Sequence, residues 1–303
     1  MLRMTILSLI LLLALMPIRM TEKAGATQSD VQNGAHSTTL YFPILKLGQG
    51  WQVSISLTNL ESEEVEVALT IYDTHGFSLG EIAGVIQAGG TTTLDAQSLP
   101  FGAASLKVES NGRLVGHALL RAIDGKKLEA LPAIKESSRQ LDFPPLVDGD
   151  ASYKTIILFN PNSTLASARI VALDESGKEV DGRNLPPLSS MESRSLSLVD
   201  ILDGGTIESV STIRVESDSS IIGLQLVDYP EGDLAGLPAL TTRSNGWIFP
   251  VITKRGDLEL WTEVGIFNPG DVVASITVEA FDVSNNSLGI IQSVSLVQEQ
   301  LIP

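Results

Sequence analysis

The chain has 303 residues, of which 43% are hydrophobic, and its 20 Lys and Arg against 36 Asp and Glu give a net charge of −16. This length suits two or three domains of roughly 100–150 residues each, and the composition is too apolar for a disordered chain. The acidic balance argues against a nucleic-acid binder, which needs a face rich in Lys and Arg. The absence of cysteine excludes disulfides, thiolate zinc sites, iron–sulfur clusters and a cysteine nucleophile.

Residues 1–26 have the features of an export signal peptide. Arg3 supplies a basic start, Thr5–Met16 is an almost unbroken apolar run, and Ala24-Gly25-Ala26 offers the small-x-small pattern that signal peptidases accept. A helix of this run would reach only about 18 Å across a hydrocarbon core of about 30 Å. We therefore expect a secreted, periplasmic or cell-surface protein with no membrane span in the mature chain and a flexible tail at 27–40. An uncleaved signal anchor is the alternative.

Three segments of the chain share one ordered set of landmark residues. Each opens on Phe-Pro, has an aromatic residue seven or eight positions before an Asn, an Asp fourteen positions after that Asn, and Gly or Asn three positions further on. The landmarks are Trp51, Asn59, Asp73 and Gly76, then Tyr153, Asn160, Asp174 and Gly177, then Trp261, Asn268 and Asp282. Val-Glu-Ser and Leu-Pro-Ala follow in the first two segments. Agreement in both order and spacing indicates an internal repeat.

Between the landmarks, apolar and polar residues alternate, as in Val65–Ile71 and Ile276–Ala280. A period of two is typical of antiparallel strands with one buried face. Helical structure is expected only as short turns near Asp95–Leu99 and Leu198–Leu202. Each complete unit of about 100 residues then holds roughly seven short strands, which is the size and texture of a β-sandwich.

The repeat predicts an all-β chain of tandem antiparallel β-sandwich modules, two complete and one truncated. The expected modules cover residues 41–134, 143–240 and 247–303, with linkers between them. The ordered motif FP…W…I-x-L-x-N-(P)…Y/F-D-x-x-G…V-E-S…G…L-P-A resembles tandem immunoglobulin-like or fibronectin-III-like modules of secreted and surface-attached bacterial proteins. The resemblance covers nearly all of residues 41–303 and implies a β-sandwich architecture at the cell surface. The chain departs from true immunoglobulin domains in lacking their Cys…Trp…Cys core.

The third module stops early. Val-Glu-Ser begins 49 residues after Asn59 and 55 residues after Asn160, whereas 35 residues follow Asn268. A half sandwich leaves strand edges and one apolar face uncovered. Three explanations compete: a truncated reading frame, pairing of the exposed edge with a partner or another copy, and packing against the second module.

One catalytic motif is formally present. Gly76–Gly80 matches G-x-S-x-G, which in α/β-hydrolases holds a nucleophilic Ser between a buried strand and a helix. No helical pattern follows it, and the second copy has Glu179 at the position of the Ser. We therefore interpret this segment as the hairpin turn of the first module.

Metal and acid–base chemistry find little support. The only histidines are His36, His75 and His117, and they lack the spacing of a zinc-binding pair. The acidic turns at Asp148–Asp150 and Asp200–Asp203 do not follow the EF-hand pattern, which favours surface acids over a Ca²⁺ loop. The recurring Asp residues each precede a turn, where Asp accepts backbone N–H groups. We expect no catalytic residue, no cofactor and no metal.

Two functions remain open. The first is a secreted, non-enzymatic protein with a structural, adhesive or ligand-presenting role, which binds a protein or polysaccharide through exposed loops or a free strand edge. The second is a set of carbohydrate-binding or accessory modules of an exported hydrolase, or a fragment of a longer surface protein. Burial of Trp51 and Trp261 would identify them as core residues, and exposure on a flat face would identify them as platforms for sugars.

Overall fold

The computed structural model describes residues 37–45, 50–125, 127–143, 154–174, 176–202, 210–228, 234–241, 266–268, 273–282, 286–296 and 301–302. The expected export signal lies outside these residues. Within them, regular structure is β-strand apart from the 3-10 turn η1 (Ala96–Ser98) and the short helix α1 (Leu198–Ile201), where helical turns were expected. The prediction of an all-β fold is confirmed. None of the helices in this part of the chain has the length and apolarity that a bilayer crossing needs.

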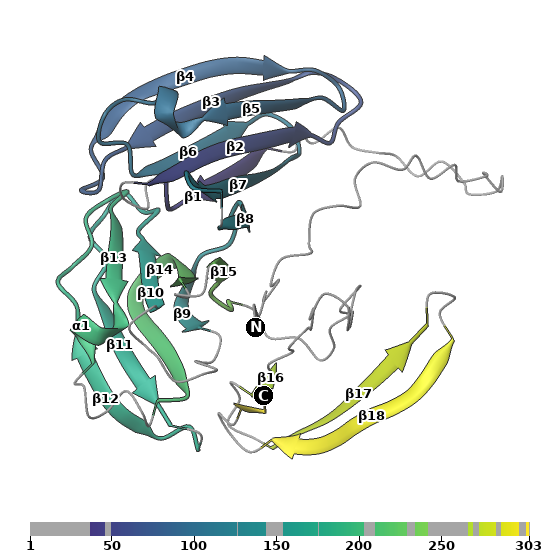
Figure 1. The fold of residues 1–303 in the computed structure, drawn as a ribbon. Coiled ribbons are helices and arrows are strands. Elements are labelled where there is room, and N and C mark those ends of the chain that lie inside the picture. The colour runs from purple at the N-terminus through teal and green to yellow at the C-terminus, as the bar shows by residue number, and fades with distance from the viewer. Residues whose placement is uncertain are drawn as a thin grey trace, which may run out of the picture.

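The first sandwich, residues 38–132, consists of two four-stranded antiparallel sheets (Figure 1), with strand orders β1-β6-β3-β4 and β5-β2-β7-β8. Its strands are β1 (Thr38–Phe42), β2 (Trp51–Asn59), β3 (Val65–Tyr72), β4 (Ser78–Ile86), β5 (Thr91–Asp95), β6 (Ser105–Ser110), β7 (Leu114–Ala122) and β8 (Leu128–Pro132). Strict alternation places Val53, Ile55 and Leu57 of β2 in the core between the sheets, each at most 3% exposed.

The second sandwich, residues 138–238, has the same arrangement with one fewer strand. Its strands are β9 (Ser138–Phe143), β10 (Lys154–Phe159), β11 (Ala168–Leu173), β12 (Glu179–Asn184), β13 (Ser193–Ser197), β14 (Thr212–Asp228) and β15 (Leu234–Pro238). The long β14 takes the place of both β6 and β7. Its first half pairs with β11 and β9, and its second half pairs with β10 and β15. One strand therefore belongs to both layers of this sandwich.

Two segments expected to be irregular are strands. The chain enters β1 at Thr38, within the expected tail, and β9 begins at Ser138, within the expected linker of residues 135–142. Leu40 of β1 and Leu141 of β9 are fully buried, and both strands pair along one edge of a sheet. Both segments begin with polar residues, but Leu40 and Phe42 of β1 and Leu141 and Phe143 of β9 alternate with their neighbours and fill the cores.

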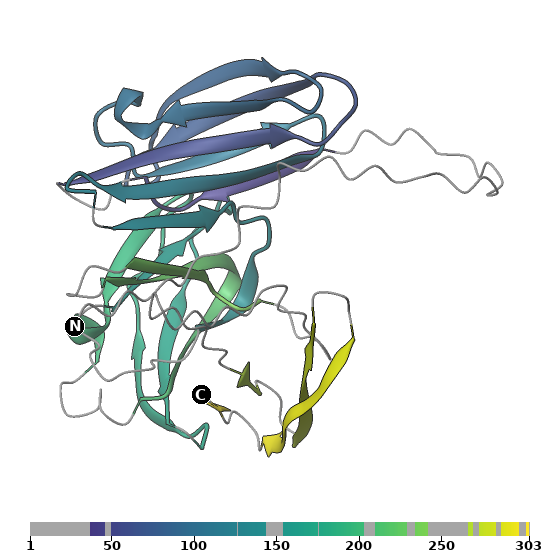
Figure 2. The same cartoon turned by 45° about the vertical axis from the view of Figure 1, so that its right-hand side comes forward.

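The two sandwiches share a hydrophobic core where they meet. In β10, Ile156 and Leu158 face the interior of the second sandwich, whereas Ile157, with Leu224 and Leu226 of β14, belongs to the cluster that fills the first sandwich. All three residues of this second group are at most 3% exposed. The strands of the first sandwich run across those of the second, which lie beneath it (Figures 1 and 2). One sheet of the second sandwich is thus covered on both faces.

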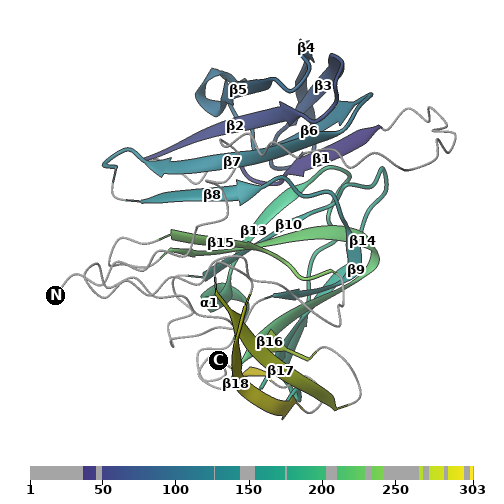
Figure 3. The same cartoon turned by 90° about the vertical axis from the view of Figure 1, so that its right-hand side faces the viewer.

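Specific contacts fix this junction. The rings of Tyr41 and Phe159 lie 5.5 Å apart between centroids. The Ser193 hydroxyl donates a hydrogen bond to the Pro43 carbonyl at 2.6 Å. Strands β8 and β15 run side by side (Figure 3). The Gly236 N–H of β15 donates to the Glu129 carboxylate of β8 at 3.1 Å, and Lys127, just before β8, pairs with Asp228 at the end of β14. The junction therefore combines apolar packing with directional bonds.

The remaining described residues form two antiparallel pairs, β16 (Ile266–Phe267) with β19 (Leu301–Ile302) and β17 (Ala274–Phe281) with β18 (Ser287–Leu296). By order and spacing these strands correspond to β2, β5, β3 and β4 of the first sandwich. Ile276 and Val278 of β17 are only half-buried, whereas the corresponding Val67 and Leu69 of β3 are 6% exposed.

Candidate functional site

The landmark Asn residues end their strands and are buried. The Asn59 side-chain amide donates to three carbonyls, of Glu63, Ile86 and Gln87, at 2.7 to 3.1 Å. Asn160 donates in the same pattern at 2.8 to 3.0 Å. In both residues the side-chain oxygen accepts the backbone N–H two positions on. Asn268 is also buried. These amides connect two loops at one end of each sandwich.

The landmark Asp residues organise hairpin turns. Asp73 and Asp174 each accept the backbone N–H groups two and four positions on, at 2.9 to 3.0 Å, and Asp282 accepts the one four positions on at 2.8 Å. The side-chain hydrogen bond from Ser176, with two backbone N–H groups, lowers the pKa of Asp174. The structure does not bring the three carboxylates together in a common site.

The glycines of these turns have positive φ, +87° at Gly76 and +78° at Gly177. At Gly76 a side chain would also meet the Ser190 carbonyl of the second sandwich, because a Cβ there would lie only 1.9 Å from it. This turn begins the Gly76–Gly80 segment, which leads directly into β4 rather than into a helix. The structure therefore lacks the strand–helix context of a hydrolase nucleophile at this segment.

The structure describes one of the three landmark aromatic residues, Trp51. Trp51 is half-buried at the start of β2 and packs against the core of the first sandwich. Tyr153 and Trp261 lie outside the described residues, as do His36 and the turn at 148–150.

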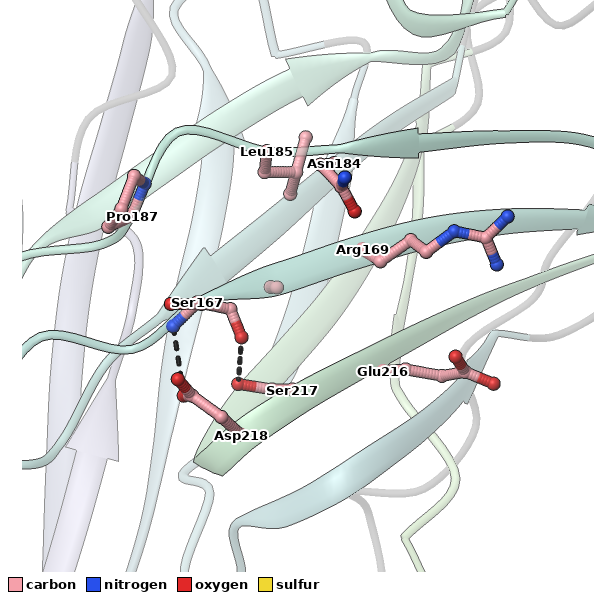
Figure 4. Close-up of a pocket in the computed structure, with 9 residues that line it drawn as sticks. Ser167, Arg169, Asn184, Leu185, Pro187, Glu216, Ser217 and Asp218 are labelled. Atoms are coloured by element: carbon pink, nitrogen blue, oxygen red, sulfur yellow. Dashed lines mark hydrogen bonds between the residues drawn. The ribbon is translucent and has the colours of Figure 1, made fainter.

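A shallow, open groove with many polar side chains lies on the outer face of the second sandwich (Figure 4). It has a volume of about 390 Å³. Strands β11, β12 and β14 supply its walls, and the segments at their ends supply the rest. The lining residues are Ser167, Ala168, Arg169, Asn184, Leu185, Pro187, Glu216, Ser217 and Asp218. A rim of hydroxyl, amide, guanidinium and carboxylate groups suits a polar ligand.

Arg169 is the cation of the groove and lies along its strand (Figure 4). Its guanidinium pairs with Glu179, and Glu216 on β14 adds attraction. The hydrogen bond with Glu179 and these charges raise the pKa of Arg169 despite some desolvation. Gly182 leaves room for the guanidinium, because a Cβ at this position would lie 2.4 Å from Arg169 Nη2. Arg169 is thus attracted by two carboxylates, Glu216 of the lining and Glu179 outside it.

Asp218 holds the other end of the groove. Its side chain accepts the Ser167 N–H at 2.9 Å, and its own N–H donates to the Ser167 carbonyl at 3.0 Å. These contacts, led by the backbone N–H of Ser167, lower the pKa of Asp218. The Ser217 hydroxyl donates to the same carbonyl at 3.0 Å. A serine nucleophile needs a base that takes its proton, so this bond positions the loop and does not activate Ser217.

The described residues contain no group of three or more His, Asp or Glu side chains arranged to hold a metal. The two histidines among the described residues are not part of the groove, with His75 exposed in the β3–β4 turn and His117 on β7. The arrangement can therefore recognise polar groups by hydrogen bonds and charge.

The sequence did not indicate this groove, because its residues come from three strands. Arg169 pairs in register with Asn184 on one side and with Glu216 on the other. In the first sandwich the matching positions are Ala68, Ala83 and Glu109. The available signal in the sequence was that Ala68 and Ala83 of the first repeat are replaced by Arg169 and Asn184 in the second.

No protein-family model matches the chain, and no curated protein matches its sequence. Among solved structures, the chain is similar to a β-glucuronidase from glycoside hydrolase family 2, with 11% identity, a TM-score of 0.15, and coverage of 66% of this chain and 23% of that one. It is similar to recombinant N-glycanase F (PNGase F), with 11% identity, a TM-score of 0.19, and coverage of 62% and 86%. A glycosyl hydrolase family 2 member from Bacteroides cellulosilyticus DSM 14838 shows 10% identity, a TM-score of 0.16, and coverage of 86% and 30%. The chain spans less than a quarter of the β-glucuronidase.

Proposed function

We propose that this chain is a secreted, non-enzymatic β-sandwich protein with a structural, adhesive or ligand-presenting role at or near the cell surface. The junction carries the proposal. Ile157, Leu224 and Leu226 of the second sandwich complete the core of the first, so separating the two sandwiches would expose this apolar surface to water. A pair of sandwiches held in one orientation is suited to act as a spacer that presents loops and strand edges at fixed positions.

The rigidity of this spacer is testable with two spin labels. The chain has no cysteine, so Ser62→Cys and Lys178→Cys can be labelled in the full chain without removing a native thiol. Both residues are exposed in turns, one in each sandwich. We expect one narrow distance distribution by pulsed electron paramagnetic resonance. A broad distribution, as from two independently moving sandwiches, would contradict the spacer role.

The location is tested separately. The apolar run and small-x-small pattern within residues 1–26 support export, and a C-terminally tagged full chain expressed in a bacterium should be recovered outside the cytoplasm. A variant with Leu11→Arg and Leu12→Arg interrupts the apolar run and should remain inside the cell. Cytoplasmic retention of the unchanged chain would contradict export.

A second function, carbohydrate binding as an accessory module, is supported by the polar groove. Arg169 and Asn184 offer planar side chains, and Glu216 offers acceptors, around one concavity. Trp51 is half-buried and packs against the core, so it does not provide a flat aromatic platform for a sugar. Binding of the full chain to a panel of neutral and acidic oligosaccharides tests it, with Arg169→Ala expected to weaken any binding at least tenfold. Lys178→Ala, on an exposed turn outside the groove lining, is the matched control.

A further inference from the structure

Strand β4 is an edge of the first sandwich with little protection by charge. Among the described residues it pairs only with β3, at the end of its sheet. It is nine residues long and contains one charged residue, Glu81. Ile82 is 39% exposed and Val85 is 52% exposed. Long apolar edge strands readily accept another strand, and proteins normally protect them with charges, Pro or bulges. The register shift of this hairpin lies at Leu79 and leaves Gly80–Ile86 in regular pairing with β3.

The second sandwich protects the corresponding edge. Strand β12 carries three charged residues among six, namely Glu179, Asp181 and Arg183. Ile82 and Arg183 occupy the same place, because they pair with Leu69 and Ile170, which are matching core residues of β3 and β11. The same fold in the same chain thus carries Arg at this position on one edge and Ile on the other.

Strand β18 is a second edge without protection by charge. It begins with Ser-Leu-Gly, as β4 does, and contains no charged residue over its ten residues. Gly80 and Gly289 both have positive φ, +152° and +109°, and a register shift lies at this end of each hairpin. The β17–β18 pair has a second shift between Ile290 and Gln292. Leu288 is 69% exposed and Ile290 is 65% exposed. Among the described residues, β18 pairs only with β17.

We propose that β4 of one copy of this chain pairs with β18 of a second copy. Added strand pairing satisfies backbone N–H and C=O groups along both edges and covers Ile82 and Ile290. Charge disfavours self-pairing of β4, because β4 with β4 brings two Glu81 side chains to the seam, whereas β4 with β18 brings one. The two edges lie on different parts of the chain, so the contact is heterologous and links copies head to tail.

The test uses the full chain in sedimentation velocity over a range of concentrations. We expect reversible growth of the sedimentation coefficient with concentration. Added salt should enhance it, because each copy carries a net charge of −16 and screening weakens the repulsion between copies. Ile82→Arg, which copies the residue of β12, and Ile290→Lys should each be monomeric alone. An equimolar mixture of the two variants should form a one-to-one dimer, because one retains β18 and the other retains β4.

Each alternative has its own outcome. If the Ile290→Lys variant still dimerises alone, β4 pairs with itself. If the Ile82→Arg variant still dimerises alone, β18 pairs with itself. Either result overturns the proposal. A wild-type chain that stays monomeric at all concentrations and salts also overturns it. Asp181→Asn on β12 changes the charge by the same single unit as the two test variants and should leave association unchanged. Circular dichroism of each variant checks that the fold is retained.

Discussion

At the scale of single residues, the buried Asn side chains have the largest structural role of the landmarks. Asn160 is fully buried, and its amide holds three carbonyls. Removing it takes away its bonds to these carbonyls and those that its oxygen accepts from Asn162, although the Leu188 and Ser189 carbonyls still accept the N–H groups of Ala166 and Glu192. Each lost hydrogen bond costs about 0.5–1.5 kcal/mol.

We therefore expect Asn160→Ala to lower the free energy of unfolding by roughly 2–4 kcal/mol. Chemical denaturation measures this loss of stability. The matched control is Asn111→Ala, because Asn111 is exposed and accepts a single N–H, from Glu66, and its loss should cost about 1 kcal/mol or less. Equal losses at the two positions would contradict the assignment.

His117 predicts a pH dependence. Burial lowers its pKa below the ordinary value of 6.5, so the folded state favours the neutral imidazole. The resulting stability is present above pH 6.5 and is lost as the pH falls through the lowered pKa. The melting temperature should therefore drop between pH 7.5 and 5.5, and the drop should shrink in His117→Gln. An unchanged drop in the variant would assign it to other groups.

At the scale of elements, one turn differs between the sandwiches in an informative way. Met191, between β12 and β13, has φ +57°, and the matching residue between β4 and β5 is Gly89 with φ +61°. A side chain in this conformation costs roughly 1–2 kcal/mol. Met191 is 9% exposed and packs with Phe159 and Ile222 at the junction. The backbone cost at this turn is offset by apolar burial against the first sandwich.

Two substitutions separate these effects. Met191→Ala keeps the backbone cost and loses the buried side chain, so we expect a loss of about 2–3 kcal/mol in the free energy of unfolding. Met191→Gly loses the same side chain but removes the backbone cost, and should be less destabilised than Met191→Ala by about 1 kcal/mol. Thermal unfolding of the two variants gives their order, and the reverse order would refute the explanation.

The repeat made the strands and their turns predictable, because alternation and turn residues are local signals. Other elements depended on distant partners. The run Ile156–Phe159 is apolar at every position, whereas the matching Ile55–Thr58 alternates with Ser and Thr. An unbroken apolar strand indicates burial on both faces, yet the surface that covers the second face lies about 100 residues earlier in the chain. The groove residues meet only through strand register, which a single sequence does not specify.

At the scale of the whole molecule, the junction leads us to expect that the two sandwiches unfold as one unit. Phe159→Ala removes a fully buried ring between them and should cost about 3–5 kcal/mol. Amide hydrogen exchange should rise in β1 and β8 as well as in β10 and β14. Thr58→Ala, at the matching position of β2, should change stability by about 0.5 kcal/mol or less. A rise confined to the second sandwich would show that the two unfold independently.

The ends of each sandwich also determine how it would respond to mechanical force. Tyr41 and Ile134 exchange two backbone hydrogen bonds of 2.9 Å, and Asp142 and Leu240 exchange a matching pair. The bonded segments are antiparallel, so the chain enters and leaves each sandwich on the same side, and tension would act along these bonds rather than across them. Such bonds break one at a time. Under tension, each sandwich would therefore open first at these paired segments, and its two sheets would unfold later.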